Sequence, residues 1–255
     1  MALSDNIVCY PPRSRVRDHR TGRWPVADES WSAWARRLAL AGLYAIKPGH
    51  LRALPRLAAW QLQSLLPSRN GPQIPDPSER LPGPECLAGY LQSLDPDHVF
   101  QGLRAGMHLS GHVMPPKWLA PVDRCILQPK NLRIEKNLAR LLRQERFRMT
   151  IDRDPLGVLY GCAAPRKGRV PLTWLHPGMI KLQLNLYDAH IMHSLEVWND
   201  EGELVGGLFG YAVDDLFMIE SQFHTVRDTS KVATVGLLAH LDMWGFAGAD
   251  GDFMT

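Results

Sequence analysis

A glycine-rich stretch from His193 to Phe223, HSLEVWNDEGELVGGLFGYAVDDLFMIESQF, limits the folds open to this chain more than any other feature. It contains three runs of aliphatic and aromatic residues joined by the polar turns DEGE and DD, which predicts an antiparallel meander of three strands. Gly206, Gly207 and Gly210 lie in the middle strand. Glycine weakens a strand and marks a bulge or the close approach of a backbone or ligand. We expect either a slot with a bare backbone floor or a sheet packed tightly beneath a helix.

Strands and helices are predicted on both sides of this meander. Before it, RFRMTID reads as a strand, and DPLGVLYGCAA and HPGMIKLQLNLYDAH read as helices. After it, TSKVATVGLLAHLDMWG is apolar on most sides and predicts a helix buried against the sheet, and FAGADGDFM predicts a last strand. This order predicts an α/β (α+β) fold with a mixed, mostly antiparallel sheet flanked by helices. It is similar to the N-acetyltransferase superfamily, in which splayed central strands accept an acyl donor.

The first part of the chain has a different composition. Residues 11–24 carry five arginines and a histidine against one acid, and residues 67–84 hold six prolines and two glycines. Between them, DESWSAWARRLALAGLY and HLRALPRLAAWQLQSLL read as basic amphipathic helices, and ECLAGYLQSL further on also reads as a helix. Whether the basic extension packs on the body or contacts phosphates stays open. We predict a basic helical N-terminal extension with a proline-rich linker at 1–80, a small N-terminal subdomain at 81–145 and an acetyltransferase-like domain at 146–255.

Composition narrows the class of protein. The 255 residues are 45% hydrophobic and 22% charged, with a net charge of +3, as in an ordinary soluble domain. The four cysteines lie far apart without a CxxC pair, which argues against a disulfide or metal framework. The first residues lack the apolar stretch of a signal peptide, and no apolar run approaches the roughly 20 residues of a membrane span. We therefore expect a cytoplasmic protein.

The motifs HSLEVW, ELVGGLFGYA and LFMIESQFHTVRDTSKVA, with WLAPVDRCIL, MTIDRDPLGVLYGCAAPRKGR and TWL before them, lie within residues 85–255. Together they resemble the leucyl/phenylalanyl-tRNA–protein transferases. The resemblance implies a bacterial enzyme that moves a Leu/Phe-like amino acid from the 3′ end of aminoacyl-tRNA to the N-terminal amine of an acceptor protein or peptide. The acceptor starts with Arg or Lys, and the product is a degradation signal. The resemblance also implies no metal and no dissociable cofactor, and we expect a monomer.

Three carboxylates are implied as catalytic by this resemblance. Asp250 matches the family's aspartate on the last strand, Asp252 stands where the family has glutamine, and Glu220 matches a glutamate near the aminoacyl group. Because Asp250 and Asp252 are two residues apart, they would face the same side of a strand. There they could share a proton and orient the attacking amine. The alternative is that both are turn acids at a frayed end.

Two further groups of residues are implied as binding residues. The aminoacyl pocket would consist of Leu208, Phe217, Ser221, Gln222 and Phe223. The tRNA contacts would be Trp174, Arg166, Lys167, Arg169, Ser230 and Lys231. Trp174 would stack on a terminal base, while Ser230 and Lys231 begin a helix whose free N–H groups suit a phosphate. Core packing, charged loops and helix capping would place the same residue types at these positions.

Departures from the family pattern leave the acceptor open. GMHLSGH stands in place of a Gly-Ile-Phe-Pro motif, Gln222 and Asp252 replace a methionine and a glutamine, and the family sequence continues beyond the last strand. We therefore expect a divergent or C-terminally shortened member. Two alternatives remain: a transferase with a small-molecule or peptide acceptor, and a non-catalytic module that binds tRNA or protein.

Overall fold

The computed structural model of this chain describes residues 17, 21–45, 54–65, 71–81, 86–111, 116–165 and 173–253. The chain forms two compact units, one made of residues 1–26, 123–164 and 183–255 and the other of residues 27–122 and 165–182. Among the helices that the structure describes, none combines the length and the apolar character needed to cross a bilayer. The domain boundaries near residues 80 and 145 stay a prediction.

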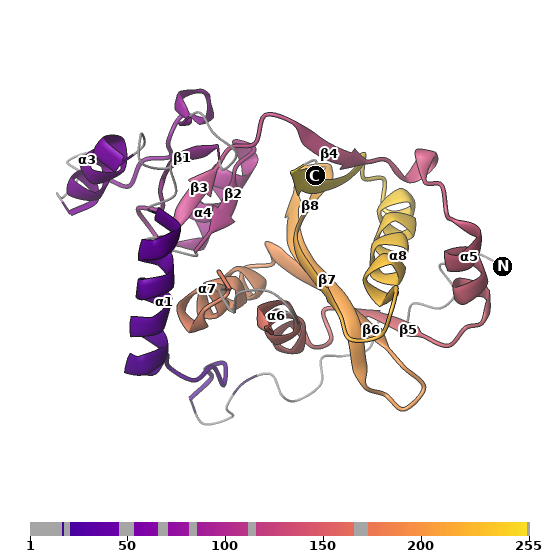
Figure 1. Cartoon of the computed structure of the whole chain (residues 1–255). Helices are drawn as coiled ribbons and strands as arrows, with labels where there is room; N and C mark the ends of the chain where they lie inside the picture. The colour runs from indigo at the N-terminus through magenta and orange to yellow at the C-terminus, as the bar shows by residue number, and fades with distance from the viewer. Residues whose placement is uncertain are drawn as a thin grey trace. The chain divides into compact units, whose positions relative to one another are not determined.

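The first unit is built on a six-stranded mixed sheet with the strand order β4-β9-β8-β7-β6-β5 (Figure 1). The strands are β4 (Arg124–Leu127), β5 (Arg148–Ile151), β6 (Met192–Trp198), β7 (Leu204–Val213), β8 (Leu216–His224) and β9 (Gly248–Phe253). Neighbouring strands are antiparallel except β8 and β9, which are parallel. The predicted meander is β6, β7 and β8. The predicted fold class, a mostly antiparallel mixed sheet flanked by helices, is confirmed.

Helices α6 (Pro155–Ala163) and α8 (Thr229–Met243) cover opposite faces of this sheet (Figure 1). The sequence predicts where α6 begins, since the Asp154 carboxylate accepts a hydrogen bond from the Gly157 N–H at 2.9 Å and Pro155 occupies the first turn. Helix α8 is largely buried, as its apolar sequence predicts, and contributes Val232, Ala233, Leu237, Leu238 and Leu241 to the main hydrophobic core. A shorter helix, α5 (Lys136–Arg143), follows η3 (Pro129–Asn131) and packs its leucines against the same core.

The glycines of β7 allow close packing. A Cβ on Gly206 would lie 2.5 Å from the Thr229 hydroxyl in α8, and a Cβ on Gly207 would lie 2.6 Å from a carbonyl oxygen of β6. A Cβ on Gly210 would lie 2.1 Å from the Met218 carbonyl oxygen. The space above these glycines is therefore filled by neighbouring atoms. The expected slot with a bare backbone floor is wrong, and the alternative of a sheet packed tightly beneath a helix is confirmed.

The second unit contains a three-stranded antiparallel sheet with the order β1-β3-β2. Its elements are α1 (Trp31–Ala45), α3 (Leu54–Leu65), η2 (Pro77–Glu79), β1 (Leu87–Tyr90), α4 (Pro96–Arg104), β2 (His108–Ser110) and β3 (Lys117–Leu119). Helix α7 (Pro177–Asp188) begins in this unit and ends in the first unit. Helices α1 and α3 confirm the two helices predicted for the extension. The helix predicted for ECLAGYLQSL is wrong, because residues 87–90 pair with β3. So short an apolar run does not distinguish strand from helix.

Candidate active site

The parallel strands β8 and β9 separate in the middle of the sheet. Their last pair is Met218 with Asp250. Beyond it, β8 continues to His224 along β7, whereas β9 continues to Phe253 along β4. Strands that part in this way interrupt the hydrogen-bonded ladder between them. We call this point the strand fork.

A β-bulge places Glu220 beside the strand fork. Phe209 pairs with Ser221 but Gly210 pairs with Ile219, so Glu220 is the extra residue of β8. Bulges redirect a side chain and often lie next to active sites. Gly210 is required here because a Cβ would collide with the backbone of β8. The prediction that a glycine in this strand marks a bulge is confirmed at Gly210.

Asp250 lies at the strand fork itself. Its side chain is 2% exposed and forms an ion pair with Arg124 of β4. A buried carboxylate held by a guanidinium differs from a turn acid at a frayed end, so that alternative is wrong for Asp250. Asp252 is in β9, as predicted, but its side chain lies outside the described part of the structure.

A buried tyrosine shares the Asp250 face of the sheet. Tyr211, Met218 and Asp250 are successive cross-strand neighbours in β7, β8 and β9, so their side chains point to one face. The Tyr211 hydroxyl donates a hydrogen bond to the Gln183 side-chain carbonyl of α7 at 3.0 Å. Burial, and then the nearby charge of Glu220, raises the pKa of Tyr211 well above its usual value. Tyr211 therefore remains protonated beside Glu220.

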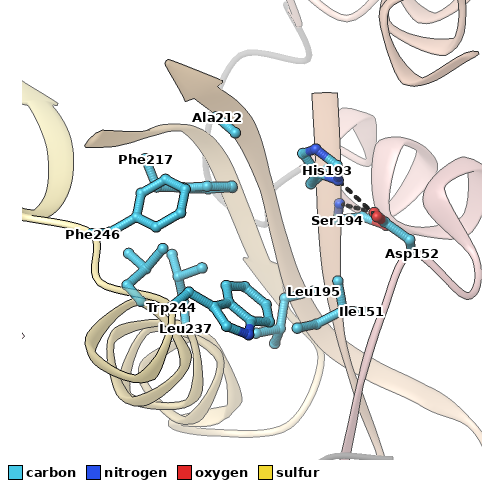
Figure 2. Close-up of a pocket in the computed structure, with 11 residues that line it drawn as sticks. Ile151, Asp152, His193, Ser194, Leu195, Ala212, Phe217, Leu237, Trp244 and Phe246 are labelled. Carbon is cyan, nitrogen blue, oxygen red and sulfur yellow. Dashed lines mark hydrogen bonds and ion pairs between the residues drawn. The ribbon is translucent and has the colours of Figure 1, made fainter. Parts of the chain in front are cut away.

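An apolar cavity of about 310 Å³ lies on the other face of the sheet, beneath α8 (Figure 2). Phe217 is one residue before the Met218–Asp250 pair, and its ring faces this cavity. The other apolar residues that line it are Ile151, Leu195, Ala212, Leu237, Leu241, Trp244 and Phe246. Although Phe217 and Met218 are neighbours in β8, the cavity and the Asp250 side chain therefore lie on opposite faces of the sheet.

One end of the cavity is polar. His193 Nδ1 lies 2.7 Å from Asp152 Oδ2, and the Ser194 N–H donates to Asp152 Oδ1 at 2.8 Å (Figure 2). Burial disfavours the charged imidazole, but the hydrogen bond and charge of Asp152, with a hydrogen bond to the His190 carbonyl, outweigh it and raise the pKa of His193. His193 is thereby oriented by a carboxylate, as in sites where an imidazole contacts a substrate.

A buried glutamate anchors the segment that carries Asp152. Glu196 of β6 is fully buried and accepts hydrogen bonds from the Thr150 and Ser194 hydroxyls, each at 2.6 Å. It also accepts from the Asp154 N–H at 3.2 Å and the Arg153 N–H at 3.4 Å. Burial raises the pKa of Glu196 to about 7, although these four hydrogen bonds favour the charged form.

Replacing Glu196 with glutamine should flatten the pH dependence of stability between about pH 4.5 and pH 7. The pKa of Glu196 is about 7 in the folded protein, against an ordinary value of 4.5. The folded protein therefore holds a proton that the unfolded chain has lost, and the wild-type free energy of unfolding falls as pH rises through this window. Urea denaturation of both proteins across the window measures this. Equal slopes in the two proteins would contradict a buried titrating carboxyl at this position.

The residues predicted for the aminoacyl pocket do not gather in one place. Phe217 lines the cavity, whereas Leu208 is buried in the core and Phe223 packs its ring against Gly161 of α6. Ser221 is half-buried, and Gln222 is exposed and accepts a hydrogen bond from Thr234 at 3.4 Å. The sequence does not predict the cavity residues on α8, because the apolar periodicity of this helix does not distinguish core positions from pocket positions.

The predicted tRNA contacts fall into three groups. Ser230 and Lys231 are in the first turn of α8, as predicted, and Lys231 is paired with Asp228 at 3.2 Å. Trp174 is half-buried in the second unit. The loop residues Arg166, Lys167 and Arg169 lie outside the described residues. Contact of these six residues with tRNA remains a prediction.

A basic surface on and around α5 was not predicted as a binding site. Its exposed cations, which we call the α5 basic surface, are Lys130, Arg133, Lys136, Arg140, Arg143, Arg146 and Arg148. Lys136, Arg140 and Arg143 share one helix face, and none of the seven forms an ion pair with another described residue. The signal in the sequence is the spacing of Lys136, Arg140 and Arg143, which recur after four and then three residues on the side of the helix away from its leucines. Exposed cations on one helix face suit a phosphate backbone.

No metal-binding cluster is found where the structure can be described: no three His, Cys, Asp or Glu side chains converge there. The candidate active site consists of the strand fork with Glu220 and Asp250, and the α5 basic surface is a candidate site for nucleic acid.

Comparison with known proteins identifies the family. The model of the family described as leucyl/phenylalanyl-tRNA protein transferase matches residues 126–255. A leucyl/phenylalanyl-tRNA–protein transferase of Alkalilimnicola ehrlichii is 38% identical over 68% of this chain and 67% of its own length. The Ectopseudomonas mendocina enzyme is 43% identical over 55% of this chain and 62% of its own length. The Azotobacter vinelandii enzyme is 36% identical over 73% of this chain and 82% of its own length. The chain belongs to the leucyl/phenylalanyl-tRNA–protein transferase family.

Proposed function

We propose that this protein is an aminoacyltransferase that moves a Leu/Phe-like amino acid from aminoacyl-tRNA to the N-terminal amine of a protein that starts with Arg or Lys. Family membership supports this reaction class. The structural observation that carries the proposal is the buried Asp250–Arg124 pair at the strand fork, with Glu220 set beside the fork by the β-bulge. A carboxylate held in a fixed position can orient the amine that attacks an aminoacyl ester.

The reaction joins an amine to an activated carbonyl. The acceptor nitrogen attacks the ester carbon, the bond to the ribose 3′-oxygen breaks, and a peptide bond forms. The proton lost by the amine ends on the ribose oxygen. Because a free α-amino group has a pKa of about 8, a sizeable fraction is already neutral at cytosolic pH. Positioning therefore contributes more than strong base catalysis.

Each group of residues has a role in this proposal. The Asp250 carboxylate accepts a hydrogen bond from the incoming amine, and Arg124 holds that carboxylate in place. Glu220, set at the bulge, lies near the aminoacyl group. The predicted aminoacyl pocket, of which Ser221 and Phe223 follow Glu220 in β8, receives the apolar side chain of the carried amino acid. Asp252, which is predicted to act together with Asp250, assists in orienting the amine.

We assign the tRNA backbone to the α5 basic surface, with Ser230, Lys231 and the predicted loop cations nearer the acceptor end. Charge on phosphates dominates the affinity of nucleic-acid complexes. We also propose that the protein acts as a cytoplasmic monomer without a cofactor. Light scattering during size-exclusion chromatography tests the oligomeric state.

Removing three cations of α5 should weaken tRNA binding and reduce its salt dependence. For the combined variant Lys136→Gln, Arg140→Gln and Arg143→Gln, the slope of log affinity against log salt should fall by about 2 to 3, because each lost phosphate contact contributes roughly 0.7–0.9. The charge-preserving variant Lys136→Arg, Arg140→Lys and Arg143→Lys serves as the control. Filter binding of charged tRNA at several salt concentrations measures both. An unchanged slope in the glutamine variant would remove α5 from the interface.

The proposed function is tested by transfer of labelled Leu or Phe from tRNA to reporter proteins that differ only in their first residue. We expect labelling of Arg- and Lys-starting reporters and none of a Met-starting reporter. Transfer to a small amine or peptide alone would favour the alternative acceptor. Retention of charged tRNA without any transfer would favour a non-catalytic binding module, and the proposed function would then fail.

A further inference from the structure

Part of the N-terminal extension packs on the segment of the second unit that carries Trp174. The family model begins at residue 126, so residues 28–37 lie outside it. These residues nevertheless belong to the same compact unit as residues 165–182. Asp28 forms an ion pair with Lys181 of α7 at 2.5 Å. This contact places the residues just before α1 beside the second turn of α7.

A buried ion pair fixes the shape of this part of the extension. Ser30 caps α1, since its hydroxyl accepts a hydrogen bond from the Ala33 N–H at 3.2 Å. Further along the helix, Arg37 Nε and Nη2 donate to the two carboxylate oxygens of Glu29 at 2.9 Å and 2.8 Å. The Arg37 side chain is only 9% exposed. Because apolar residues of similar volume often replace a buried ion pair without loss of stability, stability alone does not account for this pair.

The ion pair acts on His176, the residue that precedes α7. Burial, and then the charge of Arg37, lowers the pKa of His176 to about 4, although the charge of Glu29 opposes this. His176 is therefore uncharged at neutral pH. An uncharged imidazole packs near a guanidinium without charge repulsion, so α1 and the start of α7 fit together through this contact.

Trp174 is linked to His176 by a short and ordered segment. Leu175, between them, is 1% exposed, and its N–H donates to the Thr173 hydroxyl at 3.1 Å. Pro177 follows His176 and restricts the backbone of His176 to extended conformations. Because one buried residue joins Trp174 to His176, a displacement of His176 also displaces Trp174.

We infer that residues 28–37 of the extension position Trp174 for the terminal base of tRNA, with Glu29 and Arg37 acting through His176. This inference rests on the proposed function and on the predicted stacking of Trp174 on that base. A ring that is already held in place loses less conformational entropy when it binds. Glu29 and Arg37 are positioning residues, because Arg37 is buried and engaged with Glu29.

A double-mutant cycle tests this inference with a probe that binds without transfer. The probe is 3′-amino-3′-deoxyadenosine joined through an amide to phenylalanine, which carries the terminal nucleoside but no phosphate. We expect Trp174→Ala to weaken its binding about 5- to 100-fold, the range for loss of one stacked base. Arg37→Ala should also weaken binding. In the Trp174→Ala background, Arg37→Ala should cause no further loss, because the contact that it supports is already absent.

Two more variants complete the cycle. Arg36 is exposed and adjoins Arg37 in α1, so Arg36→Ala removes the same charge without touching the ion pair and should bind the probe as the wild type does. Glu29→Gln preserves shape and weakens the hold on Arg37. It should lower affinity in the same direction as Arg37→Ala, again only when Trp174 is present, and it covers the case in which Arg37→Ala fails to fold.

Each result has a defined consequence. Equal losses from Arg37→Ala or Glu29→Gln with and without Trp174 overturn the inference, because the effect would then not pass through Trp174. Wild-type affinity in Trp174→Ala, or in both ion-pair variants, overturns it as well. Transfer to Arg-starting reporters by a protein whose cycle is additive keeps the proposed function and refutes the inference. The expected cycle in a protein that transfers no amino acid supports the inference and refutes the proposed function.

Discussion

Replacing Asp250 with alanine should lower the rate of aminoacyl transfer by about 10²- to 10⁴-fold, the range of a group that directs proton transfer. Asp250 lies at the strand fork, is held by Arg124 and has almost no contact with solvent. Without its carboxylate the attacking amine loses its hydrogen-bond acceptor at the ester. The loss should appear in single-turnover rates, which are measured with the enzyme in excess over charged tRNA. Affinity for charged tRNA should stay nearly the same.

Two matched variants separate this effect from a general change of charge. Asp242 is an exposed acid in α8, and Asp242→Ala should transfer at the wild-type rate. Asp252→Gln installs the residue that the family carries at that position and should be tolerated or raise the rate. If Asp250→Ala keeps the wild-type rate while Asp252→Gln abolishes transfer, the roles assigned to the two aspartates are reversed.

A methyl group at Gly210 should destabilise the protein and remove its activity. The Cβ of Gly210→Ala would lie 2.1 Å from the Met218 carbonyl oxygen and 2.6 Å from the Phe217 ring. Both atoms are in β8, so relief requires the bulge or the strand pairing to rearrange. We expect a loss of about 3 kcal/mol in the free energy of unfolding, the upper end for overpacked sites. Because the bulge sets Glu220 at the strand fork, transfer should fall further than stability explains.

The control for Gly210→Ala is a glycine with open space. A Cβ on Gly42 of α1 would meet no atom within 4 Å. Gly42→Ala should therefore leave the protein equally stable or up to about 1 kcal/mol more stable, since alanine favours a helix. Denaturant unfolding compares the two variants. Equal stability of Gly210→Ala and wild type would mean that β7 and β8 are not packed as described.

The sequence predicts the centre of this fold well because its signals are local. Two polar turns between apolar runs define the meander, and an aspartate before a proline defines the start of α6. The strand at residues 87–90 was mistaken for a helix because its identity depends on pairing with β3, which lies far along the chain. The same applies to the parallel pairing of β8 with β9, since sequence patterns do not specify strand order.

The candidate site is predictable only in part, for a related reason. Glu220 stands out because an acid within an apolar strand requires a partner, whereas Asp250 is found only through the family resemblance. Glu196 does not stand out, because alternation along HSLEVW suggests an outward position, yet Thr150 and Ser194 surround it once β5 pairs with β6. The glycines of β7 suggest an empty slot, but neighbouring atoms fill the space above them. The empty space lies instead under α8, where β5, β6 and α8 come together.

The binding position of the aminoacyl group is tested most directly by photochemical cross-linking. The probe is a leucine analogue with a diazirine in its side chain, joined through an amide to 3′-amino-3′-deoxyadenosine, and the adducts are located by peptide mass spectrometry. We predict adducts on Glu220, Ser221 or Phe223 of β8, beside the strand fork. Excess unmodified leucyl analogue should abolish them. Competed adducts confined to residues outside β8 and β9 would contradict the site proposed for this protein.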